Sequence, residues 1–197
     1  DSAGLSASQT VTLTIMAVPP SLTTVHRITT DLSDQREPVI SGNRIVWTDN
    51  RNGSSIFSAT YLYDVVTDSE RRLGGSFSFS KSPAISGDRV VWEDSPIGNP
   101  DIILYDLTTN TQRRITTDPA KQWFPDISGN RIVWQDERHG NPDIYLYDLT
   151  MNTERRITTD PKGQWEPAIS GDRIVWTDYR NDPEGVDLTY GDNGDIY

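Results

Sequence analysis

PDISGNRIVW, residues 125–134, recurs with small changes at three other places: PVISGNRIVW from Pro38, PAISGDRVVW from Pro83 and PAISGDRIVW from Pro167. The four copies start 45, 42 and 42 residues apart. A repeat of that length holds about four short strands with their turns, and it cannot bury an apolar face alone. The chain is therefore predicted to be a stack of four similar β units.

The repeated phrase itself encodes two strands that meet at a tight turn. In the clearest copy the strands are Asp126–Ser128 and Arg131–Asp136, and the Gly-Asn pair between them supplies the positive φ angles of a two-residue hairpin. Two further strands are predicted at Asp143–Leu149 and Glu154–Thr158, because the connections ERHGNP and TMNT carry turn residues. No segment has helical periodicity.

The faces of these strands distinguish a propeller from a two-sheet sandwich. Ile132 and Trp134 point to one side of their strand and Val133 points to the other, so both faces are apolar. A sandwich strand with one wet face would alternate apolar and charged residues, whereas a propeller blade is covered on both sides. The predicted fold is therefore all-β, a β-propeller of four-stranded antiparallel blades with about four repeats present.

Domain boundaries follow from the repeats. Residues 1–18 contain one alternating strand, residues 19–24 form a linker within a Pro-rich stretch, and residues 25–197 form the propeller. The fourth repeat reaches only the start of its third strand at Gly194–Tyr197. The predicted blades are residues 38–73, 83–115, 125–157 and an incomplete 167–197.

Residues 25–29 are predicted to be an outermost strand without its own blade. The segment VHRITTDLSDQREP matches RRITTDPAKQWFP and RRITTDPKGQWEP, which precede the third and fourth phrases. Two explanations remain open. Either the chain is a fragment of a larger propeller, or this strand pairs with the fourth repeat and closes a four-bladed ring. The first is favoured, because four blades are the lower limit of propellers.

Composition excludes several classes of partner. The formal net charge is −11, which disfavours nucleic acid because phosphate binding needs a basic patch. There is no apolar run long enough to span a bilayer, so no membrane insertion is expected. Cysteine is absent, which excludes disulfides and thiolate chemistry.

No catalytic, metal or cofactor site is predicted. A serine hydrolase needs a nucleophile elbow such as GxSxG, and none occurs. His26 and His139 are too few for a clustered metal site, and His139 is expected to be a solvated loop residue. The acidic loops DERHGNPD and DYRNDPEGVD offer oxygens but lack the EF-hand spacing, so calcium binding is a minor alternative.

One Asp ends the second strand of every repeat, and in three repeats an Arg follows two residues later. A structural pair in each blade is the favoured interpretation, with ligand contact as the alternative. The Trp two positions before each Asp is expected to be core. The residues concerned are Asp49, Asp94, Asp136 and Asp178, then Arg51, Arg138 and Arg180, and Trp47, Trp92, Trp134 and Trp176.

The loops that connect one repeat to the next are the predicted recognition surface. They are expected to lie beside the channel mouth, on the same face as the loops between the second and third strands. Trp123 and Trp165 stand where Arg36 and Lys81 stand in the other repeats, and variation at one loop position is typical of a ligand-reading rim. Packing between blades is the alternative for both Trp. The candidate binding residues are Trp123, Trp165, Asp118, Asp160, Gln122, Gln164, Arg138 and Arg180.

From residue 25 onward the pattern PxISGxRIVWxDxRxGxxDIYLYDLxTxxxRRIT resembles the TolB-like, or PD40, β-propeller repeat. The opening DSAGLSASQTVTLTI is similar to the last strand of a PKD domain, an immunoglobulin-like module. Together they resemble modular cell-surface proteins of archaea and bacteria, which implies an extracellular location.

The resulting hypothesis is a non-enzymatic surface scaffold or interaction module. Its partner would be a protein or a glycan bound at the channel face. The alternative is the propeller of a larger secreted hydrolase or lyase with catalytic residues outside this chain. The oligomeric state is not predicted.

Overall fold

Four antiparallel sheets make up the described part of the protein. The computed structural model describes residues 25–51, 57–74, 79–95, 98–181 and 194–197, and in these ranges it contains strands and turns but no helix. The chain divides into two compact units, Asp1–Thr30 and Asp31–Tyr197, and every described strand belongs to the second. Within the described residues, no helix is long and apolar enough to cross a membrane.

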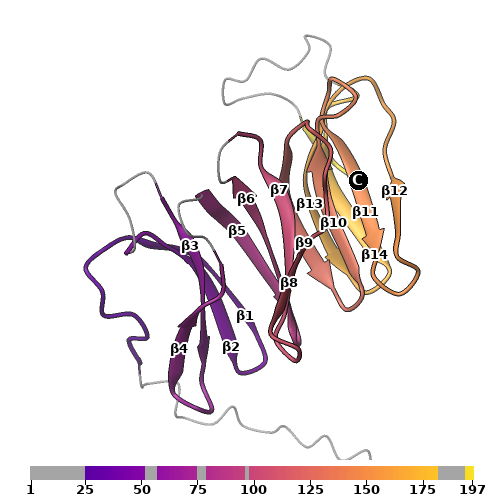
Figure 1. Ribbon diagram of the computed structural model, residues 1–197. Helices are drawn as coiled ribbons and strands as arrows, with labels where there is room; N and C mark the ends of the chain where they lie inside the picture. Colours follow the sequence, from indigo (N-terminus) through magenta and orange to yellow (C-terminus); the bar gives the residue numbers. More distant parts are fainter. Residues whose placement is uncertain (1–24, 52–56, 75–78, 96–97, 182–193) are drawn as a thin grey trace, which may run out of the picture. The chain divides into compact units, whose positions relative to one another are not determined.

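Each sheet corresponds to one sequence repeat, and its strands follow in chain order (Figure 1). Blade 1 contains β1 (Gln35–Ser41), β2 (Arg44–Asp49), β3 (Ala59–Asp64) and β4 (Ser69–Arg72). Blade 2 contains β5 (Phe79–Ser86), β6 (Arg89–Ser95), β7 (Asp101–Asp106) and β8 (Thr111–Arg114). Blade 3 contains β9 (Gln122–Ser128), β10 (Arg131–Asp136), β11 (Asp143–Asp148) and β12 (Thr153–Arg156). Blade 4 contains β13 (Gln164–Ser170), β14 (Arg173–Asp178) and β15 (Asp195–Ile196).

The Ser-Gly-Asn/Asp turn joins the first two strands of every blade, as predicted. Ser128 pairs with Arg131 across the turn, and Gly129 has a φ of 57°. The Gly-Asn pair predicts positive φ at both turn residues, but Asn130 is not among the residues with positive φ. A positive φ at the first central residue alone is typical of a type II′ turn, and glycine takes it without a steric penalty.

The first strand of each blade is longer than predicted. The predicted strand begins near the proline, with Gln122, Trp123, Gln164 and Trp165 in a loop. This prediction is wrong, because β9 and β13 begin at the glutamines. The register shifts between Trp165 and Ala168, and the residue before each proline has a positive φ. Proline has no backbone N–H to donate to the ladder, and at such a bulge it needs no partner. The two strands therefore continue to pair on the other side of the proline.

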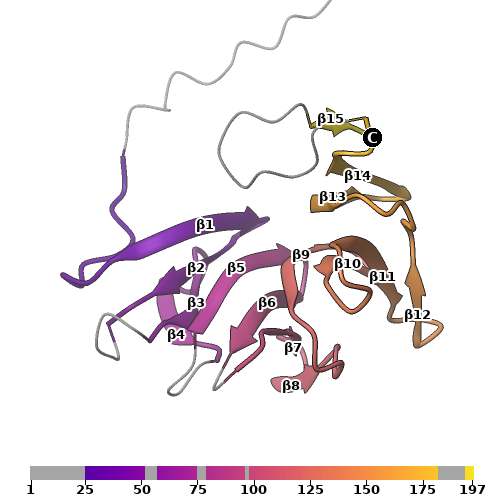
Figure 2. The same ribbon diagram turned by 90° about the horizontal axis from the view of Figure 1, so that it is seen from above.

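Successive blades pack face to face through apolar side chains. The first strands contact one another in the order β1, β5, β9 and β13, so they form the inner edge of the stack (Figure 2). Between blades 2 and 3, Val91 and Leu104 pack with Ile132 and Trp134, and both faces of each sheet carry apolar residues as predicted. Trp47 is 2% exposed, and Trp92 and Trp134 are fully buried, which confirms these three as core.

Blade 4 reaches its third strand at β15, where the sequence predicted it to begin. Asp195 pairs with Asp178 and Ile196 with Thr177, the register that Asp143 and Ile144 have in blade 3. The predicted outer strand at residues 25–29 is not a strand in the structure, and within the described residues it pairs with no other strand. The predicted PKD strand and linker, residues 1–24, lie outside the described residues.

Candidate functional site

The Asp at the end of each second strand is a hydrogen-bond acceptor inside its own blade. In blade 3, Trp134 Nε1 donates to Asp136 Oδ2 at 2.9 Å. Arg138 donates its backbone N–H and Nε to Oδ1 at 3.0 and 2.9 Å, and its Nη2 to Oδ2 at 2.6 Å. Asp136 is fully buried, so these bonds compensate for the loss of its hydration. The Asp–Arg pair predicted from the spacing is present.

An aromatic ring completes this cluster. Tyr145 stacks on Trp134 with ring centroids 5.9 Å apart, and the Arg138 guanidinium lies 4.3 Å from the centre of the tyrosine ring. Glu154 accepts a further bond from Arg138 Nη1 at 2.6 Å and ties the cluster to the fourth strand. Burial alone would lower the pKa of Arg138, but Asp136 and Glu154 together raise it above its usual value. The arginine therefore remains a structural cation.

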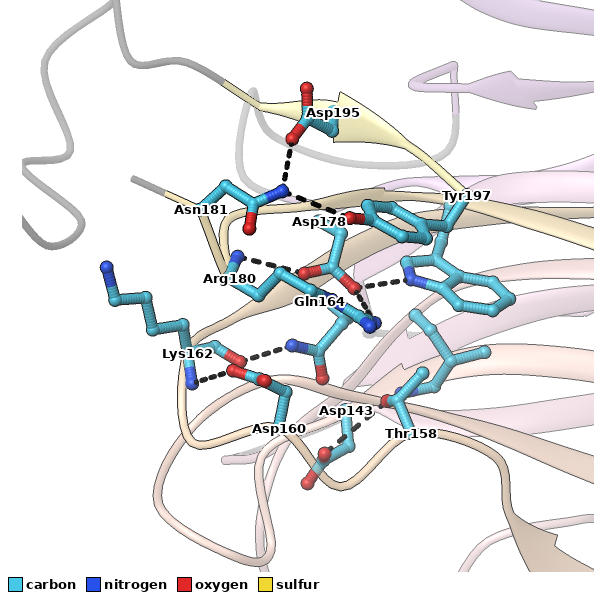
Figure 3. A network of polar contacts seen from close by, with 12 residues as sticks. Asp143, Thr158, Asp160, Lys162, Gln164, Asp178, Arg180, Asn181, Asp195 and Tyr197 are labelled. Atoms are coloured by element: carbon cyan, nitrogen blue, oxygen red, sulfur yellow. Dashed lines mark hydrogen bonds and ion pairs between the residues drawn. The ribbon is translucent and has the colours of Figure 1, made fainter. Parts of the chain in front are cut away.

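The same cluster recurs in two other blades. Blade 4 contains the copy formed by Asp178, Arg180 and Tyr197, in which Arg180 lies 4.2 Å from the ring of Tyr197 (Figure 3). Burial favours a raised pKa for Asp178, but bonds from Arg180 and Trp176 reverse that and lower it. Blade 1 uses Trp47, Asp49, Arg51 and Tyr61. A cluster repeated in this way stabilises each of these three blades.

The candidate Asp and Gln residues organise the loops that precede β9 and β13. Asp160 accepts from Lys162 N at 3.0 Å, and Gln164 donates its amide to the Lys162 carbonyl (Figure 3). Asp118 and Gln122 make the matching contacts, to Ala120 N at 2.9 Å and to the Ala120 carbonyl at 2.8 Å. Both glutamines are fully buried, so they support the loop from below.

The two kinds of loop lie on one face, as predicted. Asn141, in the loop after the second strand of blade 3, donates to the carbonyls of Asp160 and Lys162 at 3.0 and 3.2 Å. Gln164 N also donates to the Pro142 carbonyl at 2.8 Å. We call this surface, made by the loops preceding first strands and those following second strands, the loop face.

Trp123 and Trp165 lie at the loop face and are half-buried. Lys121 Nζ is 5.3 Å from the ring of Trp123, and Phe124, 36% exposed, stacks beside that ring at 6.4 Å. Trp165 packs on Gly163, where an added Cβ would come within 2.4 Å of the indole nitrogen. Both indole nitrogens are shielded from solvent and have no hydrogen-bond partner among the described residues. The blade 3 tryptophan thus belongs to a wider cationic and aromatic surface.

Sequence reasoning missed Glu93, which occupies the position of Gln135 in blade 3 and Thr48 in blade 1. Its side chain is buried, with 4% exposure, and burial raises its pKa to about 7. Phe124 N donates to its Oε2 at 3.4 Å across the blade boundary. The signal available in the sequence was a Glu at a strand position that holds Thr or Gln in the other repeats.

The other weighed residues have structural contacts. His139 is exposed and stacks on Tyr145 at 6.4 Å. Asp143, in the acidic loop considered for calcium, forms an ion pair with Arg156 at 2.7 Å. Burial raises the pKa of Asp143, and Arg156 partly offsets that effect.

No protein-family model and no curated protein sequence matches this chain. Among solved structures it is similar to TolB from Acinetobacter baumannii, with a TM-score of 0.66 and 21% identity over 86% of this chain and 42% of that one. The β-propeller domain of the Trilobed protease from Pyrococcus furiosus gives 0.60 and 13%, over 84% and 53%. A puromycin-hydrolyzing peptidase of Mycobacterium tuberculosis gives 0.66 and 11%, over 86% and 29%. The chain spans less than half of the TolB structure. At these identities the likeness establishes the fold, a TolB-like β-propeller arrangement.

Proposed function

We propose that this chain is a non-enzymatic β-propeller module of the cell surface or envelope that binds a protein or glycan at its loop face. One observation carries the proposal. The supporting Asp and Gln contacts of the loop are the same in blades 1, 3 and 4, whereas the residue after the glutamine is Arg36, Trp123 or Trp165. Blade 2 has Ser80 and Lys81 at these two positions. A loop that keeps the same internal hydrogen bonds while one of its side chains differs between blades is suited to binding a ligand.

The surface around Trp123 suggests the chemistry of the ligand. Its indole, the Phe124 ring and the Lys121 ammonium lie together within ring-stacking and cation–π distances. Aromatic rings stack on the apolar faces of sugars or on a partner's side chains, and a lysine adds selectivity for acidic groups. Asp118 and Gln122 position this surface rather than contact the ligand. Asp160 and Gln164 do the same below Trp165, and Arg138 and Arg180 support the adjoining loops.

A glycan array and a pull-down against envelope extract test the proposal. The wild-type chain should retain one class of glycan or one protein, and Trp123→Ala should lose it while remaining folded. Met151→Ala is the matched control, because Met151 is 73% exposed in the turn between β11 and β12. The proposal would be contradicted if the wild-type chain bound no glycan and no protein, or if Trp123→Ala bound the same ligand as well as the wild type does.

The second candidate is the propeller domain of a larger secreted hydrolase. It is supported by the fold similarity to the puromycin-hydrolyzing peptidase and the Trilobed protease propeller. The complete reading frame distinguishes the two. A nucleophile elbow with downstream Asp and His, and turnover of a peptide anilide by the encoded protein, would favour the hydrolase.

A further inference from the structure

A cavity of about 210 Å³ opens at the surface between blades 2 and 3. Strands of one blade alternate in direction, so the turns that join first to second and third to fourth strands lie together at the end opposite the loop face. The cavity lies at that end and is therefore separate from the loop face. It is lined by Arg89, Leu104, Asp106, Thr111 and Arg113 of blade 2 and by Leu149 of blade 3.

Arg89 reaches the cavity with its charge unpaired. Its Nη1 donates to the Gly129 carbonyl at 3.3 Å and to Asn130 Oδ1 at 2.6 Å, and both acceptors are neutral. Within the described residues Arg89 forms no ion pair. A guanidinium has further N–H donors on Nε and Nη2, so these can bind a ligand.

The equivalent arginine between blades 1 and 2 is neutralised instead. Arg44, which corresponds to Arg89, forms ion pairs with Asp64 at 3.7 Å and with Asp88. The second contact differs because blade 3 has Asn130 where blade 2 has Asp88. The fold therefore accommodates a paired arginine at this position, and the unpaired charge of Arg89 is particular to the boundary between blades 2 and 3.

Arg113 brings a second guanidinium to the cavity. It lies 5.5 Å from the centre of the Tyr147 ring, and its side chain forms no hydrogen bond or ion pair with the described residues. Arg71, at the same position of blade 1, donates to Asn110 Oδ1 at 2.7 Å. The corresponding Asn152 accepts from the Tyr147 hydroxyl instead, which leaves Arg113 free for another acceptor.

Asp106 is the acidic residue among the described lining residues, and its own turn occupies it. Asp106 Oδ1 accepts from Thr108 N at 2.9 Å and from Thr109 N at 3.0 Å. The amide of Thr109, followed by that of Thr108, lowers the pKa of Asp106 against the opposing effect of burial. Two guanidinium groups and one carboxylate leave the cavity positive, although the formal net charge of the chain is −11.

We propose that this cavity binds a short aliphatic carboxylate. Arg89 and Arg113 would bind its oxygens, because the planar fork of a guanidinium matches a carboxylate. Leu104 and Leu149 give its hydrocarbon chain an apolar wall. Typical ligand pockets measure about 300–1,000 Å³, so this smaller cavity fits one short acid. A free dicarboxylic acid and a glutamate side chain of a peptide share this chemistry.

Amide proton–nitrogen NMR spectra of the full chain, titrated at constant ionic strength, test the proposal. Sodium glutarate represents the free acid, and acetyl-Gly-Glu-Gly-amide presents the same carboxylate on a peptide. Glutaramide and acetyl-Gly-Gln-Gly-amide are the uncharged controls. Saturable shifts of the Thr111, Arg113 and Leu149 amide signals with either carboxylate, and with neither control, support the site and identify its source. Equal shifts with carboxylates and controls, or shifts confined to other signals, overturn the proposal.

Three variants separate the cavity from general attraction to arginines. Arg113→Gln should weaken carboxylate binding roughly threefold or more, because it removes one charge from a partly solvated site. Arg113→Lys keeps the charge without the fork and should be intermediate. Arg71→Gln is the matched control in blade 1 and should bind like the wild type. Unchanged affinity in Arg113→Gln, or an equal loss in Arg71→Gln, also overturns the proposal.

Discussion

Trp134 Nε1 and Asp136 Oδ2 are joined by a 2.9 Å hydrogen bond between residues two positions apart in one strand. Alternating side chains point to the same side of a strand, so the indole reaches the carboxylate without bending the backbone. The bond fixes the indole edge and one carboxylate oxygen, and Arg138 satisfies the other oxygen. The blade is thereby connected from its inner half to its outer strands.

Replacing Asp136 with Ala should destabilise the protein by roughly 2–4 kcal/mol. The change leaves the indole N–H without its acceptor and removes the main partner of Arg138, and breaking a buried pair is costly. Urea denaturation measures the free energy of unfolding. Asp136→Asn keeps an acceptor for the indole and should recover part of the loss. An equal loss of stability in both variants would mean that the negative charge of Asp136, and not its hydrogen bond with Trp134, accounts for most of the stabilisation.

Replacing Trp134 with Ala should cost about 3–5 kcal/mol, because the side chain is fully buried and its removal leaves a large cavity. Trp176→Ala should cost less, since Trp176 is only half-buried in blade 4. Thermal denaturation of both variants checks the order. An unchanged melting temperature for Trp134→Ala would contradict the strand register.

Replacing Glu93 with Gln should stabilise the protein at pH 8 and have little effect near pH 4. The folded pKa of Glu93 is raised to about 7 from 4.5 because its carboxylate is buried. A raised folded pKa means that stability is fully present below the unfolded pKa and is lost as pH rises through the folded one. The gain at pH 8 should be roughly 1–3 kcal/mol. Denaturation curves at both pH values test this, and an equal effect at both would refute the assignment.

Replacing Ser128 with Ala should destabilise the folded chain by about 1 kcal/mol, because it removes the acceptor of Gly171 N. Ser170→Ala is the matched control, since Ser170 has no such partner within the described residues. It should leave the free energy of unfolding unchanged. A similar loss of stability in both variants would show that the Ser170 hydroxyl also accepts a stabilising hydrogen bond in the folded chain.

Much of the fold could be predicted from local sequence. The limits of β10 match the predicted strand Arg131–Asp136, because a Gly turn on one side and an Asp-containing loop on the other end it. The start of β9 was predicted wrongly, because the bulge at Phe124 is stabilised by pairing with β10 and has no composition signal of its own. The Asp–Arg pair was predictable from its spacing. The tyrosine that joins it comes from another strand, and nothing in the local pattern indicated that contact.

By itself the sequence determined the repeat, the turn glycines and the strands with two apolar faces, because hydrogen bonding and side-chain alternation act over a few residues. Only the tertiary structure decided which of those faces are buried. Val133 and Val175 occupy the same repeat position, yet one is fully buried and the other is 46% exposed. The reason is that burial depends on the neighbouring blade, and identical local sequence carries no information about whether that neighbour is present.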